Sequence, residues 1–347
     1  MVLVLGIAAL IWFGGAKLQW PRTMRWLLLA LLYACILCVH LVLPDGHSLR
    51  MATGESEAFW LILGGGGILV LAYRWGLKKL QSKANRSQAE TPQTEATGPF
   101  TDTELNRYAR HIVLREIGGS GQKALKDAKI LVIGAGGLGA PALQYLGAAG
   151  IGTIGIIDDD VVENANLQRQ VIHTDDNIGM PKVFSAQTAL EAQNPFIKVL
   201  PYNRRLTPEI GDDLFAEYDL VLDGTDNFET RYLANRMAVA HKIPLISGAL
   251  TQWEGQISVF DPAQGAPCYQ CVFPEAPAPE LAPNCAEAGV LGPLPGVIGS
   301  MMAVEAIKVV TNAGTALRGQ MTIYDALYGE SRQIKLKTRA DCPICGH

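Results

Sequence analysis

Residues 129–139 read KILVIGAGGLG, and this stretch decides the fold. An apolar run of five residues predicts a buried strand, and a Gly-x-Gly-x-x-Gly turn built on Gly134, Gly136 and Gly139 follows it directly. The next residues, 140–149, favour a helix. A strand, a glycine turn and a helix in this order are typical of a nucleotide-binding unit, because the glycines let a phosphate approach the backbone at the helix N-terminus.

The residues that follow continue the same α/β pattern. A second predicted strand, at 152–157, ends in three acids beginning at Asp158, 24 residues after Gly134, where a Rossmann-type unit places its ribose-binding acid. Further predicted elements are helices near 181–193 and 228–241 and strands at 198–202, 220–222 and 244–247. This alternation predicts a doubly wound, Rossmann-like, mostly parallel sheet with helices on both faces.

Two regions extend this α/β unit. Thr101 and Glu104 form a capping-box pattern that predicts the start of a helix ahead of the first strand. Residues 256–260, 320–324 and 332–336 alternate more in the manner of antiparallel strands. We therefore expect an antiparallel extension of the sheet.

The first 97 residues have a different character. Apolar runs lie near 2–16, 26–43 and 58–73, and a helix over 26–43 would be about 27 Å long, close to the thickness of a bilayer core. We expect a membrane segment at 1–80 with spans near 26–43 and 58–75 and a third candidate at 2–16. Basic residues precede the second run and follow the third, so the positive-inside rule predicts a cytoplasmic-membrane protein whose large domain faces the cytoplasm.

The charge is divided between the two parts. Residues 1–97 carry nine Lys/Arg and five Asp/Glu, net +4, which leaves 20 basic and 28 acidic residues, net −8, for the remainder. An acidic domain argues against a nucleic-acid partner, because phosphate binding depends on Lys and Arg. The polar stretch 81–99 lacks an apolar period and predicts a flexible linker to a domain at 100–347.

Charged and amide side chains follow the predicted strands at the carboxyl edge of the sheet. The chain places Asn166 and Arg169 in an NLQRQ segment, Lys182 after Gly-Met-Pro, and Asp226 and Asn227 in a DGTDN segment. Open α/β sheets bind their ligands at this edge. Two cations, amides and a carboxylate suit a magnesium-bound triphosphate better than a nicotinamide, and this argues against an NAD-dependent oxidoreductase.

These motifs, together with CAEAGV at 285–290, resemble the ThiF/MoeB/HesA family, which is related to the ubiquitin-activating enzymes, over about residues 100–347. The resemblance implies an ATP- and Mg²⁺-dependent enzyme that adenylates the C-terminal glycine of a ubiquitin-like sulfur-carrier protein ending in Gly-Gly, releasing pyrophosphate. A sulfurtransferase would then supply the sulfur.

The resemblance also implies roles for individual residues. Asp158 is similar to the ribose acid, and Arg110 to an arginine that reaches the ATP of a neighbouring subunit, which requires a homodimer. Asp226 resembles the essential acid that places Mg²⁺ and the triphosphate. The phosphate contacts are Asn166, Arg169 and Lys182, and Gly134, Gly136, Gly137, Gly139 and Asn227 complete the expected nucleotide site.

Five cysteines lie in the large domain. Cys268 and Cys271 form one Cys-x-x-Cys pair and Cys342 and Cys345 another, which is the ligand set of a structural Cys₄ zinc site. A redox pair and unliganded thiols remain as alternatives. The remaining one, Cys285, resembles in position the cysteine that forms a covalent carrier adduct in some branches of the family.

The sequence leaves several functions open. A molybdopterin-synthase carrier is the leading substrate, favoured by the segments at 248–260 and 268–274, and the thiazole-pathway carrier is the nearest rival. Dehydration of a modified tRNA adenosine is a third activity within the family. Outside it, an NAD-dependent oxidoreductase and a non-catalytic membrane scaffold that binds a carrier are the alternatives.

Overall fold

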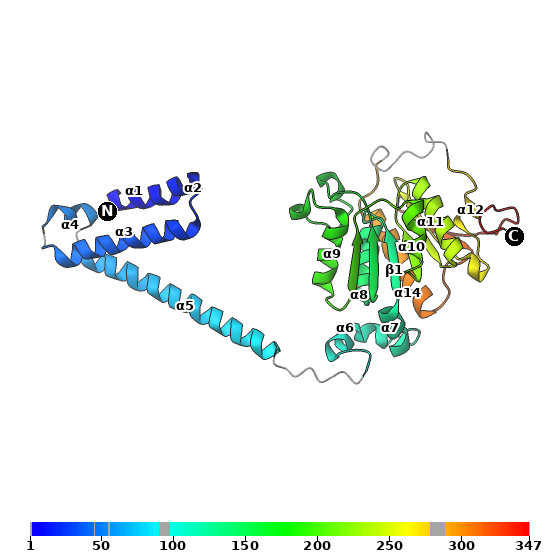
Figure 1. Ribbon diagram of the computed structural model, residues 1–347, viewed down its shortest axis with the longest axis horizontal. Coiled ribbons are helices and arrows are strands. Elements are labelled where there is room, and N and C mark those ends of the chain that lie inside the picture. The colour runs from blue at the N-terminus through cyan, green and yellow to red at the C-terminus, as the bar shows by residue number, and fades with distance from the viewer. Residues whose placement is uncertain (1, 45, 55, 90–97, 278–288, 347) are drawn as a thin grey trace. The chain divides into compact units, whose positions relative to one another are not determined.

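The chain contains two units, Met1–Glu95 and Ala96–His347. The computed structural model describes residues 2–44, 46–54, 56–89, 98–277 and 289–346, and Figure 1 shows the helices of the first unit and the sheet of the second. Each unit is described separately below.

Helices make up the described part of the first unit. The helices are α1 (Val2–Ala9), a π-helical turn (Leu10–Gly14), α2 (Gly15–Lys17), α3 (Arg22–Val42), α4 (Ser48–Thr53) and α5 (Glu57–Ala89). α3 and the Glu57–Leu77 part of α5 are long and apolar enough to cross a membrane, whereas the first apolar run forms a shorter helix, Val4–Lys17. Tyr33 of α3 donates a hydrogen bond to the Trp60 carbonyl of α5 at 2.7 Å, so these two helices pack together.

The prediction of a flexible linker over 81–99 is wrong for its first part. α5 continues as a helix through residues 81–89, and residues 90–97 lie outside the described part. Lysine, alanine, glutamine and arginine dominate 81–89, and these residues favour a helix even without an apolar face.

An eight-stranded sheet forms the centre of the second unit, in the order β3-β2-β1-β4-β5-β6-β7-β8. The first five strands in this order are parallel, and β6, β7 and β8 add to them in antiparallel pairs. The strands are β1 (Lys129–Ile133), β2 (Thr153–Ile157), β3 (Lys198–Tyr202), β4 (Leu220–Asp223), β5 (Leu245–Leu250), β6 (Glu254–Phe260), β7 (Gln320–Asp325) and β8 (Glu330–Lys335). The expected mixed sheet is therefore confirmed.

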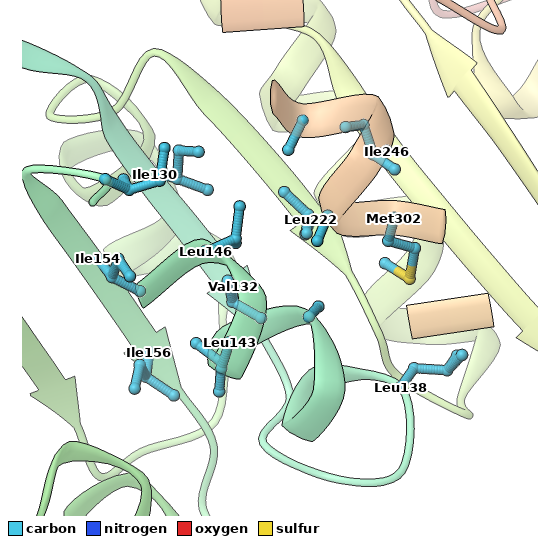
Figure 2. Packing of buried hydrophobic residues seen from close by; sticks show 14 of the residues in the cluster. Ile130, Val132, Leu138, Leu143, Leu146, Ile154, Ile156, Leu222, Ile246 and Met302 are labelled. Carbon is cyan, nitrogen blue, oxygen red and sulfur yellow. The ribbon is translucent and has the colours of Figure 1, made fainter. Parts of the chain in front are cut away.

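Alternate residues of the central strand enter two different cores. In β1, Ile130 and Val132 face one cluster while Leu131 and Ile133 face the other, as the two-residue period of a strand requires. Figure 2 shows the first cluster, in which Leu143 and Leu146 pack on the sheet. Because both faces are covered, β1 reads as a continuous apolar run and not as an alternating one.

Helices cover both sides of this sheet. The helices are α6 (Asp102–Ile112), α7 (Gly118–Asp127), α8 (Gly139–Ala149), α9 (Lys182–Gln193), α10 (Pro208–Phe215), α11 (Phe228–His241), α12 (Tyr269–Val272) and α14 (Pro293–Thr311). α8, α9 and α14 contribute to the first core, and α10 and α11 to the second. α14 is also long and apolar enough to span a membrane, but Ile298, Met302 and Ala306 are buried against the sheet.

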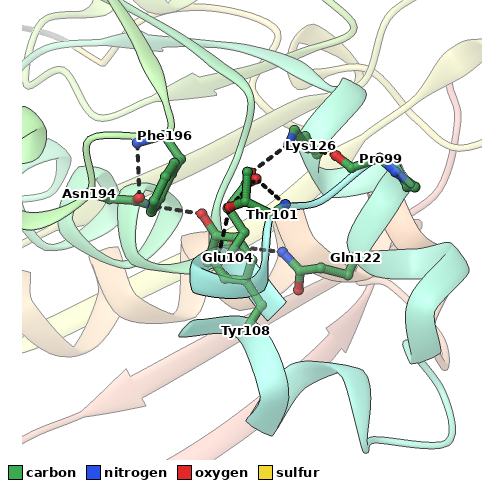
Figure 3. A network of polar contacts seen from close by, with 9 residues as sticks. Pro99, Thr101, Glu104, Tyr108, Gln122, Lys126, Asn194 and Phe196 are labelled. Carbon is green, nitrogen blue, oxygen red and sulfur yellow. Dashed lines mark hydrogen bonds and ion pairs between the residues drawn. The ribbon is translucent and has the colours of Figure 1, made fainter. Parts of the chain in front are cut away.

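A polar network fixes α6 beside the sheet (Figure 3). The predicted capping box is confirmed, with the Thr101 side chain accepting from the Glu104 amide and Glu104 accepting from the Thr101 amide. At the other end of the network, Asn194 donates to the Tyr108 hydroxyl at 2.8 Å and to the Gly147 carbonyl at 2.7 Å. These buried hydrogen bonds hold the N-terminal helix of the domain to α8 and to the loop before β3.

Candidate functional site

A cavity of about 1490 Å³ opens at the carboxyl edge of the sheet. From β1 the chain builds outward to β2 and β3, and it then returns to β4 on the other side of β1. Parallel sheets leave a crevice at such a switch point, and ligands bind there. The loops after β1 and β4, at 134–138 and 224–227, line this cavity.

The glycine loop after β1 requires glycine at both ends. Gly134 has φ +92°, and a Cβ there would lie 3.3 Å from the Gly224 carbonyl oxygen of the β4 loop. A Cβ at Gly139 would overlap the Gly134 carbonyl oxygen, so Gly139 allows α8 to pack closely on the strand. Gly139 does not line the cavity, whereas Gly136 and Gly137 do.

Backbone N–H groups of this loop are available for an anion. Among the hydrogen bonds of the described residues, none uses the N–H of Gly136, Gly137 or Leu138. These groups lie at the N-terminus of α8 and on the cavity wall. Unpaired N–H groups at a helix N-terminus favour a phosphate both by hydrogen bonding and through the helix dipole.

Asp158 lies at the end of β2, next to the glycine loop. Its Oδ2 accepts the Ala135 N–H at 2.7 Å and its Oδ1 accepts the Asp160 N–H at 2.8 Å. Burial raises the pKa of the Asp158 carboxyl, and the Lys182 charge and the two N–H groups partly offset this rise. Each carboxylate oxygen can accept a second hydrogen bond, so Asp158 can still bind a ribose hydroxyl.

The two predicted cations line the same cavity as Asp158. Lys182 begins α9, is 5% exposed, and its ammonium lies 2.6 Å from the Asp160 carboxylate. Arg169 is oriented by the Asn166 side-chain oxygen at 3.2 Å, and Asn166 itself does not line the cavity. In the structure Asn166 therefore contacts Arg169 and not the cavity itself.

The DGTDN loop after β4 brings Asp226 and Asn227 to the cavity. Asp226 is exposed, whereas the Asn227 side chain accepts the Thr230 N–H at 2.8 Å and caps α11. The Asn227 oxygen thus has a structural partner, and Asp226 supplies the free carboxylate of this loop. No described hydrogen bond or ion pair of the loop uses the Asp226 carboxylate.

Two buried charges beneath this loop escaped the sequence analysis. Asp223, fully buried at the end of β4, pairs with Arg231 at 3.3 Å and accepts from Ser247 at 2.9 Å. Arg231 also donates to the Thr225 carbonyl and, at 2.8 Å, to the Gly248 carbonyl. The signal in the sequence was weak, because a lone arginine on a helix is usually exposed.

Arg110 and Cys285 are the remaining predicted site residues of the large domain outside the Cys-x-x-Cys pairs. Arg110 is exposed on α6 and does not line the cavity of its own chain. Cys285 lies outside the described residues.

The two Cys-x-x-Cys pairs meet in space. The sulfur atoms of Cys268 and Cys271 are 3.9 Å apart. The Cys268 sulfur lies 3.6 Å from that of Cys342, and the Cys271 sulfur lies 3.3 Å from that of Cys345. Four sulfurs at about 2.3 Å from a tetrahedral zinc ion lie about 3.8 Å from each other. The donor set and the spacing therefore fit a zinc ion, and these distances are far beyond a disulfide bond.

We expect one zinc ion per chain, and Cys342→Ser to lower this content to about zero because three thiolates rarely form a closed structural site. Metal analysis of the purified full-length chain measures it. The matched control is Cys38→Ser on α3, which removes an exposed thiol outside the cluster and should leave the zinc content unchanged. Equal zinc in the two variants would contradict the assignment.

Comparisons with known proteins agree with this geometry. A model of the ThiF family matches residues 108–344. The chain is 47% identical over 251 residues to a sulfur carrier protein adenylyltransferase from Thermus thermophilus, a match that covers 71% of this chain and 93% of that protein. It is also 47% identical over 255 residues to the probable adenylyltransferase/sulfurtransferase MoeZ of Mycobacterium tuberculosis, covering 73% of this chain and 65% of MoeZ.

A solved structure shares the fold. The crystal structure of E. coli MccB with ATP matches at a TM-score of 0.60 and 23% identity, covering 70% of this chain and 75% of that one. This likeness shows the fold alone, whereas the family model spans the glycine loop, the cavity and three of the four clustered cysteines. The chain belongs to the ThiF family.

Proposed function

We propose that the domain at 100–347 uses ATP to adenylate the C-terminal glycine of a ubiquitin-like sulfur-carrier protein, with the small subunit of molybdopterin synthase as the carrier. The observation that carries the proposal is one cavity in which unpaired N–H groups, two cations and a free carboxylate converge. The name and the extent of the Thermus match support it. The alternative of an NAD-dependent oxidoreductase is disfavoured, because a nicotinamide has no use for this set of charges.

The chemistry requires positioning and charge stabilisation. A carboxylate oxygen of the carrier attacks the α-phosphorus, a new O–P bond forms, and the bond to the β-phosphate oxygen breaks. Pyrophosphate leaves with the bonding electrons, so Lys182 and Arg169 would stabilise its growing charge. The N–H groups of Gly136 and Gly137 would hold the triphosphate, and Asp158 the ribose.

A magnesium ion fits this site by the chemistry of its donors. Mg²⁺ usually binds one or two carboxylates together with the substrate phosphates, and Asp226 offers a free carboxylate on the cavity wall. When bound, the ion neutralises phosphate charge.

The cavity also extends beyond the nucleotide end. It continues over the hairpin of β5 and β6 past Trp253 and reaches Arg332 on β8. This end would admit the extended Gly-Gly tail of the carrier, since two glycines occupy little width. Such an arrangement would put the carrier body over the antiparallel strands and its carboxylate toward the glycine loop.

ATP–pyrophosphate exchange by the full-length protein tests the proposal. We expect exchange that depends on one candidate carrier, and the same carrier without its last glycine is the matched control. Exchange with the molybdopterin-synthase carrier and not with the thiazole-pathway carrier would assign the pathway. Absence of exchange with every Gly-Gly carrier, from folded zinc-loaded protein, would overturn the proposal.

A homodimer would complete the site. Arg110 cannot serve the cavity of its own chain as placed, and its helix carries Leu105, followed by Val113 and Leu114, all exposed apolar residues. We propose that this region meets a second copy and that Arg110 reaches the triphosphate in the partner's cavity.

Mixing two inactive variants tests the shared site. In a hybrid of Arg110→Ala and Asp226→Asn chains, one of the two sites has both side chains, so random exchange should restore roughly a quarter of the wild-type activity. The control mixture, Lys182→Ala with Asp226→Asn, places its defects in the same cavity and should restore nothing. No recovery in the first mixture would contradict a shared site.

We further propose that the first unit anchors the enzyme in the cytoplasmic membrane with the domain in the cytoplasm. Ile62, Ile68 and Leu69 of α5 are each more than 70% exposed, which suits contact with lipid. Lys17 ends α2, Arg22 and Arg25 lie in the first turns of α3, and further basic residues follow the apolar part of α5. The positive-inside rule therefore supports a cytoplasmic position for the N-terminal end of α3 and for the C-terminal end of α5.

Alkaline carbonate extraction of membranes measures this anchoring. We expect the full chain to stay in the membrane pellet, because the burial of two apolar helices in lipid resists carbonate. Trypsin should release the domain from inside-out vesicles and not from right-side-out ones. Extraction of the chain into the carbonate supernatant would contradict the anchor.

A further inference from the structure

His173 lies beneath the glycine loop and is almost fully buried, with 6% of its surface exposed. Its Nε2 is 2.9 Å from the Ala135 carbonyl oxygen, and its Nδ1 is 2.8 Å from the Ser185 hydroxyl of α9. Ala135 is the residue between the first two glycines of the loop. His173 therefore joins the loop after β1 to α9, the helix that begins with Lys182.

The partners of the ring define its tautomer. A carbonyl oxygen only accepts hydrogen bonds, so Nε2 of His173 must carry a proton and donate to Ala135. Burial lowers the pKa of His173 and favours the neutral ring. The Ser185 hydroxyl lies next to Nδ1 and also 3.1 Å from the Asn177 side-chain oxygen, to which it can donate, so the Ala135 carbonyl alone fixes the donor toward the glycine loop.

Ala135 is held from both sides. Its N–H donates to Asp158 and its carbonyl accepts from His173. In a trans peptide the carbonyl and the next N–H point in opposite directions, so the bond from His173 directs the Gly136 N–H away from the interior. Gly136 lines the cavity, and its N–H has no partner among the described hydrogen bonds.

The hydrogen bond from His173 to the Ala135 carbonyl restricts a loop that is rich in glycine. The peptide between Ala135 and Gly136 has glycine on its C-terminal side, and Gly134 precedes Ala135, so it can rotate at lower cost than a peptide in a loop without glycine. A rotated peptide would present a carbonyl oxygen to the phosphates and repel them. A buried donor on the carbonyl stabilises the orientation in which the N–H faces the cavity.

We propose that His173 is a positioning residue for the triphosphate, acting through the Ala135–Gly136 peptide. The inference rests on the proposed function, because it assumes that the phosphates bind at the glycine loop. It predicts that His173 affects binding of the phosphates and not of the nucleoside.

Two substitutions separate the two ring nitrogens. His173→Gln places an amide near the position of Nε2 and can still donate to Ala135, whereas His173→Asn reaches only the position of Nδ1 and the Ser185 hydroxyl. We expect His173→Gln to keep the Kd for ATP within about threefold, and His173→Asn to weaken it about tenfold by losing one bond that orients a charged contact. The Kd for adenosine, which lacks phosphate, should be the same in the wild type and both variants.

Calorimetry on the full-length protein gives these constants, with Tm as the check of folding. Equal ATP affinity in the two variants, or parallel weakening of ATP and adenosine, would overturn the inference. Hydrogen exchange of the wild type gives a test that needs no variant, since ATP and not adenosine should protect the amides at 136–138. Unchanged exchange there with ATP bound would also overturn it, whereas a wild type that binds no ATP would refute the proposed function itself.

Discussion

Asp226→Asn is expected to lower carrier-dependent ATP–pyrophosphate exchange by about two to three orders of magnitude. Asp226 supplies the free carboxylate of the loop after β4, on the wall of the cavity that holds Lys182. An amide has the same shape but cannot hold a divalent cation with a full negative charge. Because Asp226 is exposed and its carboxylate has no partner among the described residues, the substitution should leave Tm unchanged.

The matched control for this variant is Asp176→Asn. Asp176 is an exposed acid outside the cavity, so the charge change is the same and the exchange rate should stay within about a factor of two. A rate for Asp226→Asn within tenfold of the wild type would show that this carboxylate does not place the metal and triphosphate.

Arg231→Met is expected to destabilise the domain by about 3–5 kcal/mol. The Arg231 guanidinium and the Asp223 carboxylate are both buried, and methionine has a similar length but leaves Asp223 without its counter-charge. The loss corresponds to a fall in Tm of roughly 6–20 °C for a domain of this size. Thermal unfolding followed by circular dichroism or calorimetry measures it.

Two further variants identify the cause of that loss. Arg236→Met makes the same change on an exposed position of α11 and should shift Tm by at most about 2 °C. The double variant Arg231→Met with Asp223→Asn removes the stranded charge and should recover at least half of the lost stability. A double variant no more stable than Arg231→Met alone would show that packing, and not the charge, determines the cost.

Arg231 contributes both to the stability of the domain and to the position of the loop after β4. Its guanidinium holds the Thr225 and Gly248 carbonyls, and Thr225 directly precedes Asp226. His173 acts on the other loop of the cavity in a comparable way. Both loops that line the nucleotide end are thus supported by buried side chains; Arg231 also lines the cavity itself, whereas His173 does not.

Local patterns account for what the sequence could predict. The strand at 129–133 and the capping box at Thr101 and Glu104 are confirmed with the expected bounds, because apolar period and capping act over a few residues. α7, α10 and α14 were missed. α10 is short, and α14 is apolar along most of its length, so its pattern lacks the polar face that marks a surface helix.

The sequence by itself determined the glycine turn, the strands of the mixed sheet, the family resemblance and the two cysteine pairs, because each depends on residues that are close along the chain. Only the tertiary structure decided which side chains share a cavity. It brought the cysteine pairs together from 70 residues apart, gave Gly139 and Asn227 structural contacts, and placed Asp223, Arg231 and His173 under the site. These outcomes depend on contacts between distant segments, and such contacts form only when the sheet and its covering helices have packed.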